Sequence, residues 1–292
     1  MSVHDDAAPA FKAPPLACDS HFHVFGPAGR YPYVPDLRYP PPHAPLDAYL
    51  ALAKHLGFEQ RFVFVQPSAY GRDNACMLDA MRETATRYGK DCRGIVDIDE
   101  NAPDSELARL HAAGVRGVRV NVSPVHPPEA GLAEKMRPRI ERLHARCAEL
   151  GWQLDFLAPG WLTTELMPTF RTLKINFTLA HMGMHLARNG VEQPGFQQLL
   201  ELLRHGDGHC YVKLTGVYRM SVAPGFADAA PLARALIEAA PDRVIWGSDH
   251  PHLSFADRVG SVQLFNLLGE WAPDEATRRR ILVGNPQRLF GF

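Results

Sequence analysis

The stretch ACDSHFHVF, residues 17–25, has the composition of a short β-strand and carries two histidines, His21 and His23, on alternate positions. Successive side chains of a strand point to opposite faces, so the two imidazoles are expected to face the same side. Two polar rings on one face of an otherwise apolar strand indicate a site rather than a core.

The rest of the chain repeats one pattern, in which short β-rich runs alternate with longer stretches of helical period. Most of the runs are continuously apolar, as expected for parallel strands that are buried on both faces. The expected strands are residues 17–24, 61–66, 94–98, 117–120, 153–156, 176–179, 211–214 and 244–246. The expected helices are residues 46–56, 73–88, 105–113, 135–150, 162–170, 195–205 and 231–240, with further helical material at 274–290.

This alternation of eight strands with about eight helices predicts an α/β fold, a (β/α)₈ TIM barrel. An open doubly wound sheet is the alternative, but no G-x-G-x-x-G follows any early strand. We expect one domain over residues 1–292. The Pro-rich segment Tyr31–Pro45 is too long for a tight turn, and we interpret it as an ordered excursion over the barrel mouth.

The composition excludes several classes of protein. Apolar residues make up 46% of the chain, and the net charge of −1 gives no bulk attraction to nucleic acid or to an acidic membrane. The five cysteines are scattered without a C-x-x-C pair, which suits a reducing compartment. The N-terminus carries acids where a signal peptide carries basic residues, and no apolar run reaches about 18 residues. We therefore expect a soluble, cytoplasmic protein with a small-molecule partner, and whether it forms a homo-oligomer stays open.

Polar residues gather where the expected strands end, which is where barrel enzymes carry their chemistry. Burying such groups without a purpose leaves costly unpaired hydrogen bonds. The residues at these ends are His21, His23, Gln66, Ser68, Tyr70, Asp97, Asp99, Arg119, Asn121, Asp155, His181, Arg219 and Asp249. Any single one can cap a helix or hold a loop, but the set of three histidines and Asp249 indicates a catalytic site.

These residues also carry a resemblance to a known family. Asp19-x-His21-x-His23, the later His181-Met-Gly and the stretch VIWGSDHP at 244–251 resemble the amidohydrolase superfamily, within the amidohydrolase-related family 2. The ending NPQRLF at 285–290 is similar to the C-terminus of that superfamily. Over nearly the whole chain the resemblance is to its lactonase branch, which includes the pyrone-dicarboxylate lactonases.

The resemblance implies an enzyme, a carboxylic-ester hydrolase that opens a small lactone in catabolism without a cofactor. Asp249 would take a proton from water as general base, and His21, His23 and His181 would polarise the lactone carbonyl. The same scaffold also carries lactone isomerases, and that reading stays open.

A metal-dependent reading, with one Zn or Mn ion on His21, His23 and Asp249, is the other alternative. Metal-dependent relatives usually add ligands from strands four and five, where this chain has Arg119 and Asp155. Arginine does not ligate a metal, whereas Asp155 could. This shortage of ligands favours the metal-free reading.

The resemblance places Arg119 and Arg219 among carboxylate-binding positions, and Gln66, Ser68 and Tyr70 with them as substrate-binding residues. Arginine suits that role because its guanidinium pairs with a carboxylate in a bidentate fork. Lys213, on the seventh expected strand, either reaches the site or pairs with an acid inside the barrel.

The chain departs from the dicarboxylate enzyme at three positions. Val125 and Met184 stand where that enzyme has arginines, and Leu157 stands where it has a tyrosine. Fewer donors weaken the case for a substrate with two carboxylates. We expect a lactone with one anionic group, or a neutral sugar-type lactone.

Overall fold

The structure is a computed structural model that describes residues 7–292. Its strands are β1 Cys18–Phe22, β2 Arg61–Val65, β3 Asp91–Val96, β4 Val115–Asn121, β5 Gln153–Leu157, β6 Phe177–Leu179, β7 Cys210–Leu214 and β8 Val244–Trp246. Its helices are α1 Leu46–Leu56, α2 Ala75–Tyr88, α3 Asp104–Ala112, α4 Leu132–Leu150, α5 Gly160–Glu165, α6 Met167–Phe170, α7 Pro194–His205, α8 Ala230–Ala239, α9 Ser261–Trp271, α10 Glu275–Arg279 and α11 Asn285–Phe290.

The strands form one eight-stranded sheet in the chain order β1 to β8, and the pairs whose register is resolved are parallel. Helices alternate with the strands along the chain. Parallel neighbours in chain order require a crossover after each strand, and the helices supply it. The predicted (β/α)₈ fold class is confirmed.

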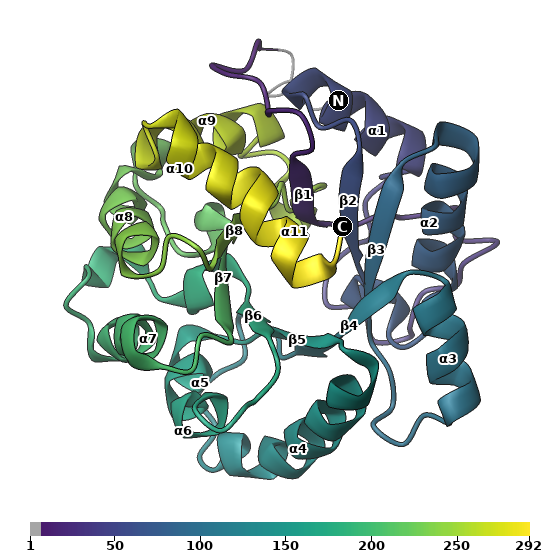
Figure 1. The fold of residues 1–292 in the computed structure, drawn as a ribbon, viewed down its shortest axis with the longest axis horizontal. Coiled ribbons are helices and arrows are strands. Elements are labelled where there is room, and N and C mark those ends of the chain that lie inside the picture. Colours follow the sequence, from purple (N-terminus) through teal and green to yellow (C-terminus); the bar gives the residue numbers. More distant parts are fainter. Residues whose placement is uncertain (1–6) are drawn as a thin grey trace. The chain divides into compact units, whose positions relative to one another are not determined.

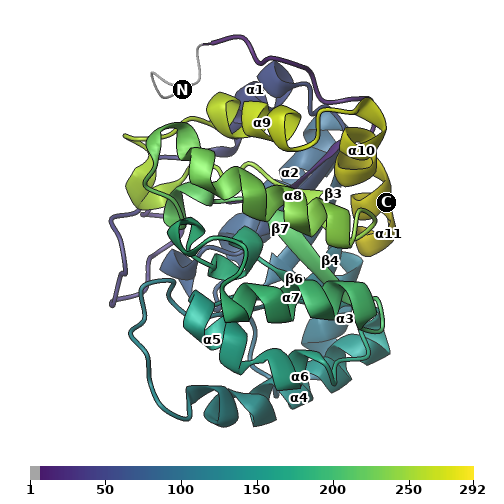
Figure 2. The same ribbon diagram turned by 90° about the vertical axis from the view of Figure 1, so that its left-hand side faces the viewer.

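The chain divides into two compact units, and each is described by itself. The first unit contains the residues up to Arg116 together with Trp246–Phe292, and the second contains Gly117–Ile245. Figure 1 shows α1 and α2 of the first unit on the outer side of β1 to β3. In the second unit α7 and α8 lie side by side, as Figure 2 shows.

The core of the first unit is built from aromatic rings. Phe22 of β1 stacks on Tyr49 of α1 with ring centroids 3.6 Å apart, and Phe62 and Phe64 of β2 pack beside it. All four side chains are at most 1% exposed. Burial of a side chain of this size is worth roughly 1.5–3 kcal/mol, so these rings fix β1 against β2 and α1.

Helix bounds follow local signals where those signals are strong. Helix α1 has the predicted bounds, because Pro45 precedes it and Gly57 ends it with a φ of 97°. The single helix predicted over 162–170 is divided at Leu166 into α5 and α6, because Pro168 has no N–H to donate to the carbonyl four residues earlier.

Helix α9 was not predicted, and strand β3 begins at Asp91 rather than at residue 94. Seven of the eleven residues of α9 are buried, and Gln263, Asn266 and Glu270 form a narrow polar stripe at helical spacing. A helix that is apolar on most sides belongs to a core. Here Phe265 of α9 packs against Trp246 and Phe58.

The Pro-rich segment Tyr31–Pro45 is held to the first unit at several points. The Tyr31 hydroxyl donates to Asp79 of α2 at 2.7 Å, Val34 N–H donates to the carbonyl of Ala69, and Phe25 and Ala44 form an isolated bridge. In the part of the chain that the structure describes, no helix is both long enough and apolar enough to span a bilayer.

Candidate active site

The imidazoles of His21 and His23, at the end of strand β1, lie on the same side of the sheet. His21 lies near the end of β1 and His23 just beyond it, and their ring centroids are 5.1 Å apart at an angle of 82°. Both side chains are buried: His21 is 0% exposed and His23 is 3% exposed. The shared face that the alternate spacing predicts is therefore present.

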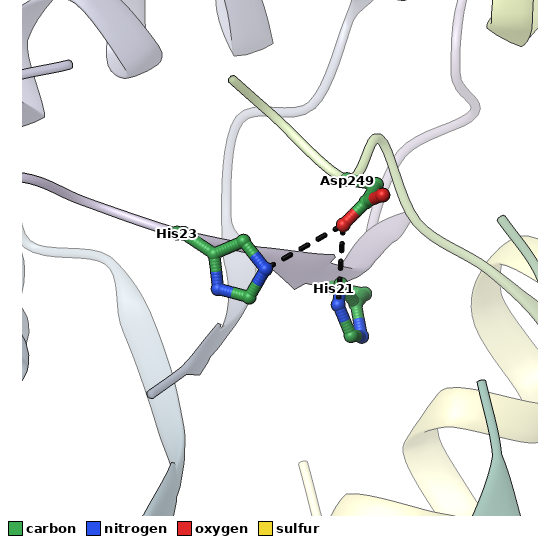
Figure 3. A group of neighbouring side chains, drawn as sticks. All are labelled: His21, His23 and Asp249. Carbon is green, nitrogen blue, oxygen red and sulfur yellow. Dashed lines mark ion pairs between the residues drawn. The ribbon is translucent and has the colours of Figure 1, made fainter. Parts of the chain in front are cut away.

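Asp249 follows β8 and meets both rings (Figure 3). Its Oδ1 lies 3.4 Å from His21 Nε2 and 3.5 Å from His23 Nε2, and the side chain is 1% exposed. The backbone N–H of Asp249 donates to the His21 carbonyl at 2.8 Å. The close approach depends on Gly247, since a Cβ there would lie 2.5 Å from His21 N.

The buried carboxylate of Asp19 connects the β1 strand to the loop that carries Asp249. It accepts hydrogen bonds from the backbone N–H groups of His21 and Ser248 and from the Tyr49 hydroxyl. Burial raises its pKa to about 6 against these donors, which lower it. The sequence shows Asp19 in the motif but gives it no role; in the structure it joins the strand of the two histidines to the loop of Asp249.

The proton position on His23 follows from its partner. His23 Nδ1 lies 2.7 Å from the Val65 carbonyl oxygen, which only accepts, so Nδ1 carries a proton. In the neutral ring, Nε2 then presents a lone pair toward Asp249. Donation from Nε2 as well requires the doubly protonated imidazolium.

The same three residues have the geometry of a metal site. Their donor atoms all lie within 4.8 Å of one another. Bonds of about 2.0–2.1 Å to a tetrahedral zinc ion place ligand atoms about 3.3 Å apart, close to the two distances measured here. The Nδ1–H of His23 on a carbonyl is also the usual outer contact of a metal-ligating histidine. The donor set therefore fits one ion.

His181 belongs to the second unit, in an unusual turn after β6. The four residues His181–Met184 have φ values of 52°, 52°, 69° and 59°, and only Gly183 adopts this region without steric cost. Two glycines make room for the turn: a Cβ on Gly160 would lie 2.5 Å from the Met184 carbonyl oxygen, and one on Gly216 would lie 2.4 Å from His181 Nδ1. The His181 ring and its backbone N–H both contact the Thr215 hydroxyl.

Arg119 lies in a buried ionic cluster on β4 to β7. Its Nε is 3.8 Å from Asp155 Oδ2, while Lys213 Nζ is 2.6 Å from Asp155 Oδ1 and the Thr178 hydroxyl donates to the same oxygen. Lys213 and Asp155 are completely buried, and Arg119 is 3% exposed. Of the two readings of Lys213, the pairing with an acid is confirmed. Asp155, the candidate extra metal ligand, is engaged by a cation and a hydroxyl.

The remaining predicted substrate-binding residues lie just after β2 and β7, where Ser68–Tyr70 and Val217–Arg219 form short 3-10 helices. Gln66 donates to the carbonyls of Gly71 and Asp73, and Tyr70 accepts from the Gly26 N–H at 3.1 Å. The Ser68 hydroxyl lies 3.5 Å from that of Tyr39. These bonds shape the loop after β2. In the second unit, the Arg219 guanidinium lies 5.2 Å from the centre of the Tyr218 ring.

His185, next to the turn of His181, is buried beside α7 without a hydrogen-bond partner for Nε2 among residues 7–292. Its ring is edge-on to Phe196 at 5.7 Å. Burial lowers the pKa of His185 from 6.5 to about 4, and burial likewise lowers that of His250 to about 3.

The lowered pKa of His185 predicts acid sensitivity. Between pH 6.5 and about 4 the unfolded chain binds a proton that the folded chain does not, so stability falls as the pH falls. A pKa lowered from 6.5 to about 4 corresponds to a full effect of about 3 kcal/mol. Urea unfolding of His185→Gln should therefore show a shallower loss of stability from pH 7 to pH 4.5 than the wild type. His205→Gln, at a side chain 70% exposed, is the control and should keep the wild-type slope. Equal slopes for all three proteins would contradict the prediction.

The chain is similar to known proteins over almost its whole length. The sequence model of the amidohydrolase family matches residues 18–292. A 4-sulfomuconolactone hydrolase from Hydrogenophaga intermedia is 39% identical over 285 residues, covering 96% of this chain and 90% of the relative. A 2-pyrone-4,6-dicarboxylate hydrolase from Comamonas testosteroni is 32% identical and a D-galactarolactone isomerase from Agrobacterium fabrum is 30% identical, each over 97% of this chain and 92% of the relative. An apo crystal structure from Agrobacterium tumefaciens has a TM-score of 0.84 at 27% identity, covering 98% of this chain and 99% of that one.

Proposed function

Because the chain belongs to the amidohydrolase family, whose model matches residues 18–292, we propose that it is a hydrolase that opens a small lactone. Two relatives that are 39% and 32% identical are a sulfomuconolactone hydrolase and a pyrone-dicarboxylate hydrolase, which supports a lactone as substrate. The observation that carries the proposal is the buried Asp249 carboxylate, whose Oδ1 lies within 3.5 Å of the Nε2 atoms of His21 and His23.

Asp249 is the general base of the proposed reaction. Its carboxylate takes a proton from water while the water oxygen attacks the lactone carbonyl. The ring C–O bond then breaks, and the proton passes from Asp249 to the leaving oxygen. A base of this kind contributes about 10²–10⁴-fold to the rate.

His21, His23 and His181 are proposed to donate hydrogen bonds to the carbonyl oxygen as negative charge develops on it. His23 already donates from Nδ1 to Val65, so it can donate from Nε2 only as an imidazolium. The Asp249 carboxylate 3.5 Å away favours that charged form.

The substrate is proposed to carry one anionic group. Arg119 and Arg219 are the proposed partners of that group, and Gln66, Ser68 and Tyr70 contribute through the loop that they shape. Val125, Met184 and Leu157 replace donors of the dicarboxylate enzyme, which supports a single carboxylate or sulfonate, or a sugar-type lactone.

The proposal is tested by following proton release with a pH indicator across a panel of lactones. The panel contains pyrone dicarboxylates, muconolactones with carboxylate or sulfonate groups, and aldonolactones. Turnover of a muconolactone that carries only its carboxylate, without turnover of the sulfonated muconolactone or the pyrone dicarboxylates, would support the single anionic group. If no lactone in the panel released protons, the proposed lactonase activity would be contradicted.

A metal-dependent hydrolase is the second candidate, favoured by the spacing of His21, His23 and Asp249 and by the Nδ1–H of His23 on a carbonyl. A bound Zn or Mn ion would supply an activated water. We favour the metal-free form because Asp155, the candidate extra ligand, is engaged by Lys213 and Thr178, and Arg119 occupies the matching position on β4.

Chelation separates the two forms. After dialysis against a chelator, we expect turnover to stay within about twofold of the untreated enzyme, because none of the proposed steps uses a metal. Elemental analysis of the untreated protein should give well below one Zn or Mn per chain. Loss of turnover that added Zn or Mn restores would contradict the metal-free form and leave the lactonase intact.

A lactone isomerase is the third candidate, since a D-galactarolactone isomerase is 30% identical over 97% of this chain. In the isomerisation proposed for this chain, Asp249 or a histidine moves a ring proton and no water is added. Incubation in deuterium oxide discriminates: deuterium on carbon in unhydrolysed lactone would support the isomerase, whereas an opened acid without carbon-bound deuterium would support the hydrolase.

A further inference from the structure

His181 and Thr215 are in hydrogen-bond contact. Thr215 lies directly after β7 and is 4% exposed. Its Oγ1 is 3.2 Å from the backbone nitrogen of His181 and 2.7 Å from the Nδ1 of the same residue. One hydroxyl therefore contacts two atoms of one histidine.

The number of protons and lone pairs decides the direction of these bonds. A threonine hydroxyl carries one proton and two acceptor lone pairs. The backbone N–H of His181 can only donate, so it uses one lone pair. Within residues 7–292, His181 is the only residue that hydrogen-bonds the Thr215 side chain, and its Nδ1 is the only acceptor there for the hydroxyl proton.

Gly216 and the burial of this region restrict both the His181 ring and the Thr215 hydroxyl proton. Gly216 covers the Nδ1 edge of the ring so closely that a Cβ on it would lie 2.4 Å from Nδ1 and 2.8 Å from Cγ. If Nδ1 were protonated and donated to Thr215, the hydroxyl proton would be buried without an acceptor, which folded proteins avoid.

We propose that Thr215 is a positioning residue whose hydroxyl donates to His181 Nδ1 and so holds the neutral ring as the Nε2–H tautomer. In a neutral imidazole one nitrogen donates and the other accepts, so the contact at Nδ1 sets the role of Nε2. The positive φ values of residues 181–184 and Gly216 fix the ring orientation, and Thr215 fixes its proton.

The consequence is a defined role for His181, and this step rests on the proposed lactonase. The Nε2–H group is a donor that can polarise a carbonyl oxygen without a change in protonation. It is the opposite of a metal-ligating histidine, which keeps a bare nitrogen for the metal and donates from the other. His181 is thereby matched to a substrate oxygen and not to an ion.

The tautomer is measured on the free enzyme by nitrogen-15 NMR of protein labelled at histidine, with the His181 signals assigned by their loss in His181→Gln. We expect wild-type His181 to show an unprotonated Nδ1 and a protonated Nε2 at neutral pH. Thr215→Val keeps the shape without the hydroxyl, and its His181 should lose that single tautomer, while Thr215→Ser should retain it. A protonated Nδ1 in the wild type, alone or in an imidazolium, would overturn the inference without any variant.

Turnover gives the second readout. Thr215→Val should lower kcat about 10–100-fold with little change in KM, as changes that touch a catalytic group only through its neighbour commonly do, and Thr215→Ser should recover most of it. Thr84→Val is the matched control: this buried hydroxyl donates to the Ala80 carbonyl of its own helix, and its loss should leave kcat and the His181 spectrum unchanged. Thr215→Val with wild-type kcat and an unaltered tautomer would overturn the inference. The expected tautomer in an enzyme that opens no lactone would support the inference and contradict the proposed function instead.

Discussion

Asp249→Asn is expected to lower kcat for lactone opening by about 10²–10⁴-fold while leaving substrate affinity nearly unchanged. The amide has almost the shape of the carboxylate but cannot accept a proton from water, which is the contribution of a general base. The backbone bond from Asp249 to the His21 carbonyl does not involve the side chain and should hold the loop in place. Stopped-flow or indicator assays give kcat, and calorimetry with the variant gives the affinity.

The control for this experiment is Asp207→Asn, which removes an exposed carboxylate paired with Lys174. It should leave both kcat and affinity at wild-type values. Hydrolysis retained by Asp249→Asn would refute the assignment of the base. Loss of affinity together with loss of a bound metal would instead support the metal-dependent candidate, for which Asp249 is a ligand.

Asp155→Asn and Lys213→Met are each expected to lower the free energy of unfolding by about 3–5 kcal/mol. Each removes one partner of a completely buried ion pair and leaves the other charge without it in a low-dielectric interior. Asp155→Asn also leaves Arg119 3.8 Å from a neutral amide in place of a carboxylate. Urea unfolding followed by far-UV circular dichroism measures both losses.

A double-mutant cycle shows whether the loss of stability comes from the interaction between Asp155 and Lys213. The combined Asp155→Asn, Lys213→Met protein should be less destabilised than the sum of the single variants, because no unmatched charge of the pair remains. The exposed pair Lys174–Asp207, with side chains 63% and 60% exposed, provides the matched control. Its two single variants should change stability by at most about 1 kcal/mol. Additive losses in the buried cycle would show that Lys213 and Asp155 are not coupled.

The order of strands and helices could be predicted from the sequence because buried parallel strands and amphipathic helices leave local patterns. Helix α1 is the clearest case, with Pro45 before it, Gly57 after it and an apolar face between. Helix α9 carries a comparable pattern, because Gln263, Asn266 and Glu270 lie on one face and the buried residues lie on the others. Its period could therefore be read from the sequence, and the prediction that left this helix out was wrong.

In the candidate site, too, some features could be predicted from the sequence and others could not. His21, His23 and Asp249 could be predicted because alternation on a strand and position at a strand end are local properties. The partners of these groups could not. The bond of Asp19 to Ser248 joins residues 229 positions apart, and the pairing of Lys213 with Asp155 depends on the register of three strands. Such contacts appear only when the strands are assembled.

The left-handed turn at His181–Met184 also decides how this enzyme can be re-engineered. Gly160, Gly195 and Gly216 each face this turn or His185 at a distance that no larger residue fits, the added Cβ lying 2.5, 2.9 and 2.4 Å from it. Any substitution at these positions forces the turn or the neighbouring side chains to shift. Val125 and Val222, which are 87% and 94% exposed on loops of the same unit, have room for larger side chains and are better positions for diversity in a directed-evolution campaign.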